Sequence, residues 1–278
     1  MTQTNKRTWF ITGATSGIGR ELVELALENG ENVAAAARST ASLTSLTEEW
    51  ASQLLPIDVD VRDASAVAAA VGRVVVRFGR IDVVANNAGY GLFGAVEEAS
   101  DQQARAIFDT NVFGVLNVLR ATLPVLRAQR SGHVLQGSSL YGQSAHSGVG
   151  LLAATKYAVE GITDALAGEV EPLGIKVTLI QPGPTATSFL ANLDFAGAQL
   201  EDYDQTVRAV QKAIGELPAE AFASARRVAE GIREVVASDA PPVRLALGSS
   251  GAAQMRAALT ARLDELDLWA KVTDAAGA

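Results

Sequence analysis

Residues 8–25 read TWFITGATSGIGRELVEL and place a group of glycines between a strand-like and a helix-like segment. TWFITG is typical of a buried strand, and the segment behind it has the apolar spacing of a helix that ends at Gly30. Gly13, Gly17 and Gly19 permit a tight turn and let the backbone approach a ligand without a Cβ in the way. The helix start offers unpaired N–H groups and a positive dipole end, which bind phosphate. We therefore interpret this stretch as a cradle for a dinucleotide.

Short apolar runs alternate with helix-length segments from residue 7 to about residue 182. The further expected strands are NVAAAAR (32–38), LLPIDVDV (54–61), IDVVANNAG (81–89), HVLQGSS (133–139) and IKVTLIQPG (175–183), and the expected helices lie at 65–79, near 101–129 and at 152–172. Strands buried on both faces and alternating with helices predict a parallel sheet with helices on both sides. Right-handed crossovers then give an α/β, doubly wound Rossmann fold.

The pattern loosens after Pro182, where residues 184–225 predict helices and loops over the sheet edge. PPVRLAL (241–247) predicts a last strand, and 252–270 predicts a closing amphipathic helix. Without a repeat or a linker, the sequence favours one domain over 1–278. Its dinucleotide-binding core spans 7–183, and its substrate loop and C-terminal segment span 184–278.

The composition narrows the function classes. The chain has 278 residues, 48% of them hydrophobic, and a net charge of −8, which argues against nucleic acid or an anionic membrane as partner. No cysteine is present, so a cytoplasmic location is expected, and with only His133 and His146 no metal site is expected. No apolar run is long enough for a signal peptide or a membrane span.

Several motifs occur in an order that resembles the classical short-chain dehydrogenase/reductase family. They are TGATSGIG (12–19), IDVD (57–60), NNAG (86–89), Asn111 in DTNVFG, Ser139 in GSS, Lys156 in ATKYAVEG, and PGPTAT (182–187). The resemblance covers nearly the whole chain. It implies a nicotinamide dinucleotide cofactor, a small-molecule substrate, and a homodimer or homotetramer formed through the helices near 101–129 and 152–172.

The end of the second strand sets the expected choice of cofactor. Ala37 and Arg38 stand where a carboxylate would bond the 2′-hydroxyl of NAD, and a guanidinium suits the 2′-phosphate of NADP. We therefore favour NADP over NAD. By resemblance, Asp58 bonds the adenine with Val59 beside it. The predicted dinucleotide contacts are Gly13, Thr15, Ser16, Gly17, Ile18, Gly19, Arg38, Asp58, Val59, Asn87, Ala88, Gly89, Lys156, Pro182, Gly183, Thr185 and Thr187.

The resemblance also assigns catalytic roles to Asn111, Ser139 and Lys156. In the family, a tyrosine four residues before the lysine gives the proton, and the i, i+4 spacing puts both on one helical face. Here that position is Leu152. A hydrocarbon cannot donate or relay a proton, and proton transfer by a positioned side chain is worth about 10²–10⁴ in rate.

Other side chains near this position carry protons but are not assigned as donors. Tyr157 follows Lys156 and turns by about 100° to another helix face, so we interpret it as packing. Tyr141, His146 and Tyr90 lie in loops expected near the nicotinamide. Three explanations of Leu152 stay open: a deliberate substitution in a normal reductase, a non-redox enzyme such as a cyclase, isomerase or lyase, or a dinucleotide-binding protein without turnover.

The substrate site is expected to be apolar. The candidate lining residues are Leu92, Phe93, Tyr141, His146, Leu151, Leu152, Phe189, Leu190 and Phe195. Their character predicts a hydrophobic carbonyl or alcohol of moderate size. The sequence thus predicts an NADP-dependent oxidoreductase that lacks the tyrosine proton donor.

Overall fold

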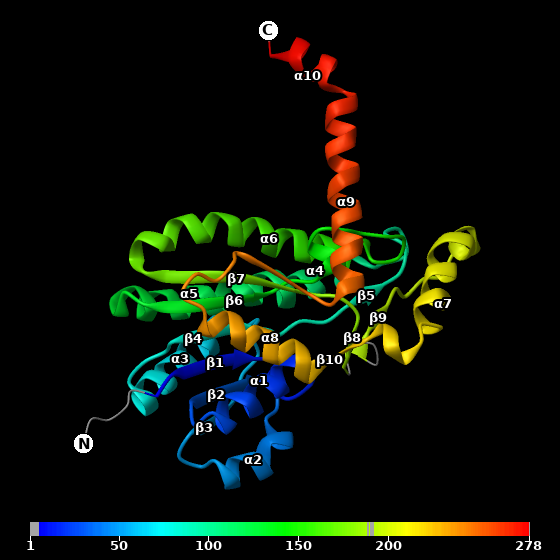
Figure 1. The fold of residues 1–278 in the computed structure, drawn as a ribbon. Coiled ribbons are helices and arrows are strands. Elements are labelled where there is room, and N and C mark those ends of the chain that lie inside the picture. Colours follow the sequence, from blue (N-terminus) through cyan, green and yellow to red (C-terminus); the bar gives the residue numbers. More distant parts are fainter. Residues whose placement is uncertain (1–5, 188, 190–191, 278) are drawn as a thin grey trace.

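A parallel seven-stranded sheet forms the centre of the computed structural model, which describes residues 6–187, 189 and 192–277 (Figure 1). The strand order is β11-β7-β6-β4-β1-β2-β3, and every neighbouring pair is parallel. The strands are β1 (Thr8–Thr12), β2 (Asn32–Ala37), β3 (Leu54–Asp58), β4 (Val83–Asn86), β6 (Gly132–Gly137), β7 (Ile175–Pro182) and β11 (Arg244–Leu247). The order reverses between β1 and β4, where open α/β sheets bind ligands, and this confirms the predicted Rossmann fold.

Helices cover both faces of the sheet because alternate strand residues point to opposite sides. Phe10 and Val84 pack towards α3 (Ala64–Phe78), α5 (Gly114–Gln129) and α6 (Gly150–Val170). Trp9, Ile11 and Val83 pack on the other face, towards α1 (Gly17–Glu28) and α8 (Ala225–Ala237). The short α2 (Thr44–Glu49) follows β2 at the sheet margin (Figure 1).

The segment expected as one helix near 101–129 is interrupted. It comprises α4 (Asp101–Phe108), a π-helical turn η2 (Asp109–Phe113) and then α5. A π-turn inserts one extra residue per turn, which re-aims the side chains that it carries. Asn111 lies in this turn and is buried. The local interruption therefore lies where the sequence places a catalytic residue.

The segment 184–225 forms a separate layer beside the carboxyl ends of the strands. Two-residue strands pair β8 (Thr185–Ala186) with β10 (Ala223–Ser224), and β5 (Leu92–Phe93) with β9 (Asp194–Phe195). The π-helical turn η7 (Asp204–Arg208) leads into α7 (Ala209–Gly215), drawn in yellow on the right of Figure 1. Helices and loops over the sheet edge were expected here, and the two small sheets were not.

The C-terminal helix forms but does not close over the fold as predicted. In α9 (Ser249–Leu268) only Gly251 and Met255 are buried, while Leu263 and Leu266 are about 60% exposed. The upper part of α9 and α10 (Ala270–Ala276) project from the body (Figure 1). The apolar residues of 252–270 suggested a packed face, but Leu263, Leu266 and Leu268 are exposed, and beyond Met255 it is the polar Arg262 that contacts Tyr157 of α6.

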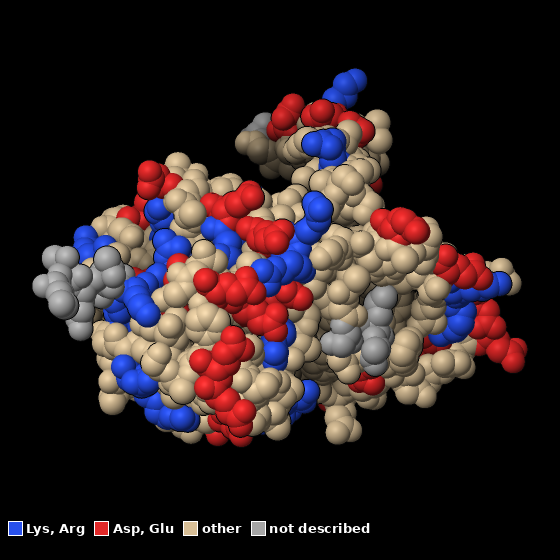
Figure 2. All heavy atoms as spheres, turned by 60° about the horizontal axis from the view of Figure 1, so that its bottom comes forward, with Lys and Arg blue, Asp and Glu red and all other residues tan. Residues whose placement is uncertain are grey.

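Acidic and basic side chains are interspersed over much of the face drawn in Figure 2, which also has a broad uncharged area beside the residues drawn in grey. Within residues 6–187, 189 and 192–277, no helix is long and apolar enough to cross a membrane. The same residues contain no cluster of three or more His, Asp or Glu side chains arranged to hold a metal ion.

Candidate functional site

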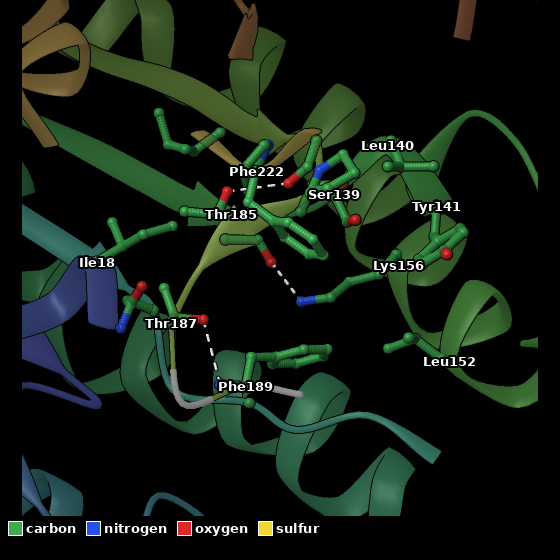
Figure 3. Close-up of a pocket in the computed structure, with 18 of the residues that line it drawn as sticks. Ile18, Ser139, Leu140, Tyr141, Leu152, Lys156, Thr185, Thr187, Phe189 and Phe222 are labelled. Atoms are coloured by element: carbon green, nitrogen blue, oxygen red, sulfur yellow. Dashed lines mark hydrogen bonds between the residues drawn. The ribbon is translucent and has the colours of Figure 1, made fainter. Parts of the chain in front are cut away.

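A cavity of about 450 Å³ opens at the carboxyl ends of the central strands, between the sheet and the 184–225 layer. Fourteen of the predicted site residues line it: Ile18, Asn87, Gly89, Phe93, Ser139, Tyr141, His146, Leu152, Lys156, Pro182, Gly183, Thr185, Thr187 and Phe189. Figure 3 shows how ten of the lining residues are arranged. The strand order brings together residues that lie up to 171 positions apart in the sequence.

The glycine cradle is held by the first strand and the NNAG segment. Asn87 Nδ2 donates to the carbonyl oxygens of Thr12 and Gly13, both at 3.2 Å, and the Thr12 hydroxyl accepts from the N–H groups of Asn87 and Ala88. A Cβ on Gly19 would overlap the Gly13 carbonyl oxygen and lie 2.5 Å from Asn87 Nδ2. Gly19 is therefore required by the close approach of α1 to this turn.

The N-terminus of α1 faces the cavity without a side-chain cap. Ser16 is the N-cap residue and makes no capping hydrogen bond. Gly13 and Gly17 have φ values of 63° and 53°, which residues other than glycine rarely adopt. A Cβ on Gly17 would also lie 3.1 Å from the Thr187 side chain. Uncapped N–H groups at a glycine-rich helix start fit the pyrophosphate of a dinucleotide.

The end of β2 and β3 carries the residues expected at the adenosine end. Asp58 Oδ1 accepts hydrogen bonds from the Thr40 hydroxyl at 2.6 Å and from the Thr40 N–H at 2.8 Å, and these bonds lower the pKa of Asp58. Arg38 is exposed and has no hydrogen-bond partner among the described residues. Val59 is buried beside Asp58. An unpaired guanidinium here fits a 2′-phosphate.

Of the three predicted catalytic residues, Ser139 and Lys156 line the cavity, whereas Asn111 is buried in η2 and does not. Lys156 Nζ donates to the Gly137 carbonyl oxygen at 2.8 Å, and loss of water around the ammonium lowers the pKa of Lys156 to about 8. Asn111 Oδ1 accepts from the Tyr90 N–H at 3.1 Å, while its Nδ2 donates to the Tyr90 carbonyl and to the Thr155 hydroxyl. The Ser139 hydroxyl lines the cavity and has no partner within the described part of the chain.

Leu152 lies one helical turn before Lys156 on α6 and is 1% exposed. It packs with Phe93, Ile107 and Val149 in an apolar cluster under the cavity. Figure 3 shows its side chain on the same side of the pocket as Lys156. At the position where the family resemblance predicts a tyrosine, this chain therefore contributes only a hydrocarbon side chain to the site.

The PGPTAT segment forms the wall opposite Leu152. The Gly183 N–H donates to the Leu247 carbonyl at 2.8 Å, and the Thr185 hydroxyl donates to the Gly183 carbonyl at 3.0 Å. The Thr187 hydroxyl accepts from the Phe189 N–H at 3.1 Å (Figure 3). Both threonines line the cavity next to Ile18. Their place between the cradle and Lys156 fits the predicted contacts to the nicotinamide end.

Some predicted lining residues lie elsewhere. Leu92 is buried in the apolar cluster of Leu152 and does not line the cavity, and Phe195 is 52% exposed on β9. Leu151 packs at the edge of that cluster. Leu190 lies outside the described residues. Nine of the predicted dinucleotide contacts also lie beyond this cavity: Gly13, Thr15, Ser16, Gly17, Gly19, Arg38, Asp58, Val59 and Ala88.

One wall of the cavity is helical and was not predicted from the sequence. Val210, Ala213, Ile214 and Leu217 come from α7 and the turn after it, and Phe222 and Gln254 complete this side. The first four are spaced as on one face of a helix, so the sequence of 207–217 already indicated an amphipathic helix here. Their contact with the cavity depends on how α7 docks.

A second missed feature is the buried carboxylate of Glu160, one turn after Lys156. It accepts from the Ser138 hydroxyl at 2.5 Å, from Gln143 and Gln181, and from Arg244 Nε at 3.0 Å. This network fixes Ser138, the neighbour of Ser139, and so positions the serine loop. A glutamate four residues from Lys156 on an otherwise apolar helix face was the available signal.

The short chain dehydrogenase family model matches residues 7–198, and the chain belongs to this family of oxidoreductases. It is 36% identical over 241 residues to the oxidoreductase BOA17 of Botryotinia fuckeliana, covering 86% of this chain and 88% of that protein. It is 35% identical over 242 residues to a 3-ketodihydrosphingosine reductase of Bacteroides thetaiotaomicron, with 86% and 87% covered.

Solved structures share the same fold. A short-chain dehydrogenase from Streptomyces avermitilis superposes with a TM-score of 0.91 at 33% identity, over 97% of this chain and 98% of that one. A family member from Burkholderia phymatum, solved with NAD, has a TM-score of 0.78 at 23% identity, over 92% and 94% of the two chains. The second likeness shows the fold alone.

Proposed function

We propose that this chain is an NADP(H)-dependent oxidoreductase that acts on a hydrophobic carbonyl or alcohol by hydride transfer. The observation that supports this most is that one apolar cavity contains both the Ser139 hydroxyl and the Lys156 ammonium, with the cradle residue Ile18 in its wall. The relation to oxidoreductases and the exposed, unpaired Arg38 support the reaction class and the choice of NADP.

The residues have distinct roles in this proposal. When bound, the reduced nicotinamide supplies a hydride to the carbonyl carbon. The Ser139 hydroxyl donates a hydrogen bond to the carbonyl oxygen and polarises it. The Lys156 ammonium would hydrogen-bond the nicotinamide ribose. Asn111 holds the main chain of Tyr90 by two hydrogen bonds. The first turn of α1 binds the pyrophosphate, and Arg38 binds the 2′-phosphate.

The proposed substrate is a hydrophobic ketone. Phe93, Phe189, Ile214 and Phe222 line the cavity, and its only titratable lining side chains within the described residues are Tyr141, His146 and Lys156. Such a wall binds apolar groups and offers few polar contacts to a hydrophilic substrate. The relative described as a 3-ketodihydrosphingosine reductase is consistent with a long apolar ketone.

A non-redox enzyme on the same scaffold is the second candidate, and Leu152 is the observation that favours it. An aliphatic side chain that is 1% exposed lies where the family resemblance predicts an acid. Chemistry that needs no protic tyrosine, such as a cyclisation, isomerisation or elimination, is compatible with this wall.

The test is a panel of apolar ketones assayed with NADPH, using the native chain and Leu152→Tyr. We expect NADPH oxidation by the native chain and faster oxidation by the variant, because the variant has a phenol one helical turn before Lys156 that can give its proton to the carbonyl oxygen. Leu151→Tyr is the matched control, since it adds the same phenol at a neighbour that does not line the cavity.

Two results would overturn the proposal. Conversion of a substrate with no change in NADPH would identify a non-redox enzyme. Binding of NADPH with no conversion by either chain would identify a binding protein. Thermal melts of both variants show whether each is folded before either conclusion is drawn.

A further inference from the structure

Tyr141 and His146 form a hydrogen-bonded pair in the wall of the cavity, close in sequence to Ser139. The Tyr141 hydroxyl lies 2.7 Å from His146 Nε2, and the two rings meet edge to face with centroids 5.1 Å apart. The Phe93 ring also lies beside the imidazole, tilted by 49° and with a centroid distance of 6.3 Å. Both polar side chains line the cavity. The pair is therefore held by packing and lies beside the proposed reaction site.

The second ring nitrogen fixes how the pair shares its protons. His146 Nδ1 lies 2.9 Å from the Ser147 carbonyl oxygen, which can only accept, so Nδ1 carries a hydrogen. In neutral His146, Nε2 is then an acceptor and takes the hydrogen bond of the Tyr141 hydroxyl. When His146 is an imidazolium, Nε2–H donates to the Tyr141 oxygen instead. The phenol hydrogen is then released to point into the cavity.

The position of Tyr141 suits a substitute for the absent acid. It lies two residues after Ser139 in the short helix η3 (Leu140–Gly142) and packs against the apolar cluster that contains Leu152. Figure 3 shows Tyr141, Leu152 and the chain of Lys156 on one side of the pocket, across from Ile18 and Thr187. A phenol is thus present on the leucine side of the cavity, supplied by another element.

We propose that Tyr141 donates the proton that Leu152 cannot, and that His146 recharges it from solvent. This rests on the proposed carbonyl reduction. The carbonyl carbon gains a C–H bond from the reduced dinucleotide, and the electron pair of the C=O π bond moves to oxygen. That oxygen takes the Tyr141 proton. The phenolate oxygen then takes the Nε2 proton of the imidazolium, and the partly exposed neutral His146 regains a proton from water.

The surroundings of Tyr141 favour the reductive direction. Burial raises the pKa of Tyr141 to about 12, so the phenol stays protonated at ordinary pH. A protonated phenol is a donor to a developing alkoxide and a poor base towards an alcohol. Lys156 is the third titratable group of the cavity wall, and its ammonium donates a hydrogen bond to the Gly137 carbonyl oxygen.

The first test combines Tyr141→Phe with Leu152→Tyr. Tyr141→Phe should slow single-turnover ketone reduction by about 10²-fold in the native chain, but by less than about threefold when residue 152 supplies a phenol of its own. A merely structural Tyr141 would cost the same in both backgrounds. Tyr157→Phe is the matched control, since this hydroxyl contacts Arg262 of α9 and does not line the cavity.

The second test separates proton relay from packing at His146, a positioning residue. His146→Gln keeps a hydrogen-bond acceptor but cannot be recharged, so it should lose turnover as fully as His146→Ala, and added imidazole should rescue only the alanine variant. If glutamine restores turnover, the relay is overturned. A readout in the unloaded protein is the nitrogen NMR signal of the imidazoles, of which the chain has two. Tyr141→Phe should shift the His146 signal and leave that of the buried His133 unchanged.

The outcomes distinguish this inference from the proposed function. Reduction by the native chain that survives Tyr141→Phe overturns the inference and leaves the reductase standing. Reduction only by Leu152→Tyr does the same, because the pocket is then a reductase's without a native donor. If neither chain oxidises NADPH with any ketone, both proposals are overturned.

Discussion

The two halves of the cavity are held together in different ways. On the dinucleotide side, the turn after β1 is fixed by main-chain atoms, the Thr12 hydroxyl and the Asn87 amide, all within two short motifs. On the substrate side, α7 contributes its apolar face, and the segment before it is fastened by one long-range ion pair. The first half depends on local contacts within short motifs, whereas the second half depends on contacts between distant segments.

The ion pair shows what holds the substrate side. The Glu98 carboxylate accepts from the N–H groups of Ala95 and Leu200 and from both terminal nitrogens of Arg208, at 2.5 and 2.9 Å. Its side chain has no exposed surface, while that of Arg208 is 22% exposed. Residues about 100 positions apart thus meet at a single carboxylate. This explains why the dinucleotide side could be read from short motifs and the substrate side could not.

The dinucleotide side should be most sensitive to Gly19→Ala. The added methyl would overlap the Gly13 carbonyl, so we expect a loss of about 1–3 kcal/mol in stability and a large loss of NADPH affinity. Thermal melts and fluorescence titration with NADPH measure both effects.

Gly72→Ala is its control. Gly72 lies on the exposed face of α3 with no atom within 4 Å of an added Cβ, so it should gain about 0.5–1 kcal/mol. If Gly19→Ala binds NADPH as tightly as the native chain, the dinucleotide side is less constrained than its geometry indicates.

The dinucleotide side could also be predicted better from the sequence than the substrate side. The parallel sheet and the glycine turn were predicted because strand periodicity and glycine chemistry are local. The break of the 101–129 helix at Asn111 was not, since no proline or glycine marks residues 109–113. The exposure of α9 was missed because an apolar sequence does not show whether a partner surface exists. Tyr141 and His146 were recognised as loop residues near the site, but their hydrogen bond depends on the fold of residues 140–149.

Arg38→Ala tests the preference for NADP at the adenosine end of the dinucleotide side. If the exposed guanidinium bonds the 2′-phosphate, its loss should weaken NADPH binding by about tenfold, the usual scale of one charge-assisted hydrogen bond. NADH binding should hardly change. Arg62→Ala is the control because Arg62 is already paired with Asp60 at 2.6 Å. Equal weakening of both cofactors by Arg38→Ala would contradict the preference for NADP.

The smallest expected effect is on the substrate side, from Arg208→Met. The hydrogen bonds from Arg208 lower the pKa of Glu98 to about 2, from an ordinary value of 4.5. A carboxyl whose pKa is lowered by folding stabilises the fold above its ordinary pKa and loses this contribution as the pH falls towards about 2. The difference in melting temperature between the native chain and Arg208→Met should therefore be full at neutral pH and shrink below about pH 4.5.

Arg105→Met is the matched control for that pair, since Arg105 and Asp101 form an ion pair on α4 with side chains 74% and 79% exposed. Exposed pairs of this kind contribute little, so no measurable change in melting temperature is expected. Hydrogen exchange adds a local readout, because Arg208→Met should speed exchange at the Leu200 N–H more than anywhere in the glycine cradle. Uniform loss of protection across the sheet would mean that the substrate layer and the dinucleotide core unfold as one unit. The two halves of the cavity would then differ in the contacts that hold them but not in the unfolding reaction that exposes their amides.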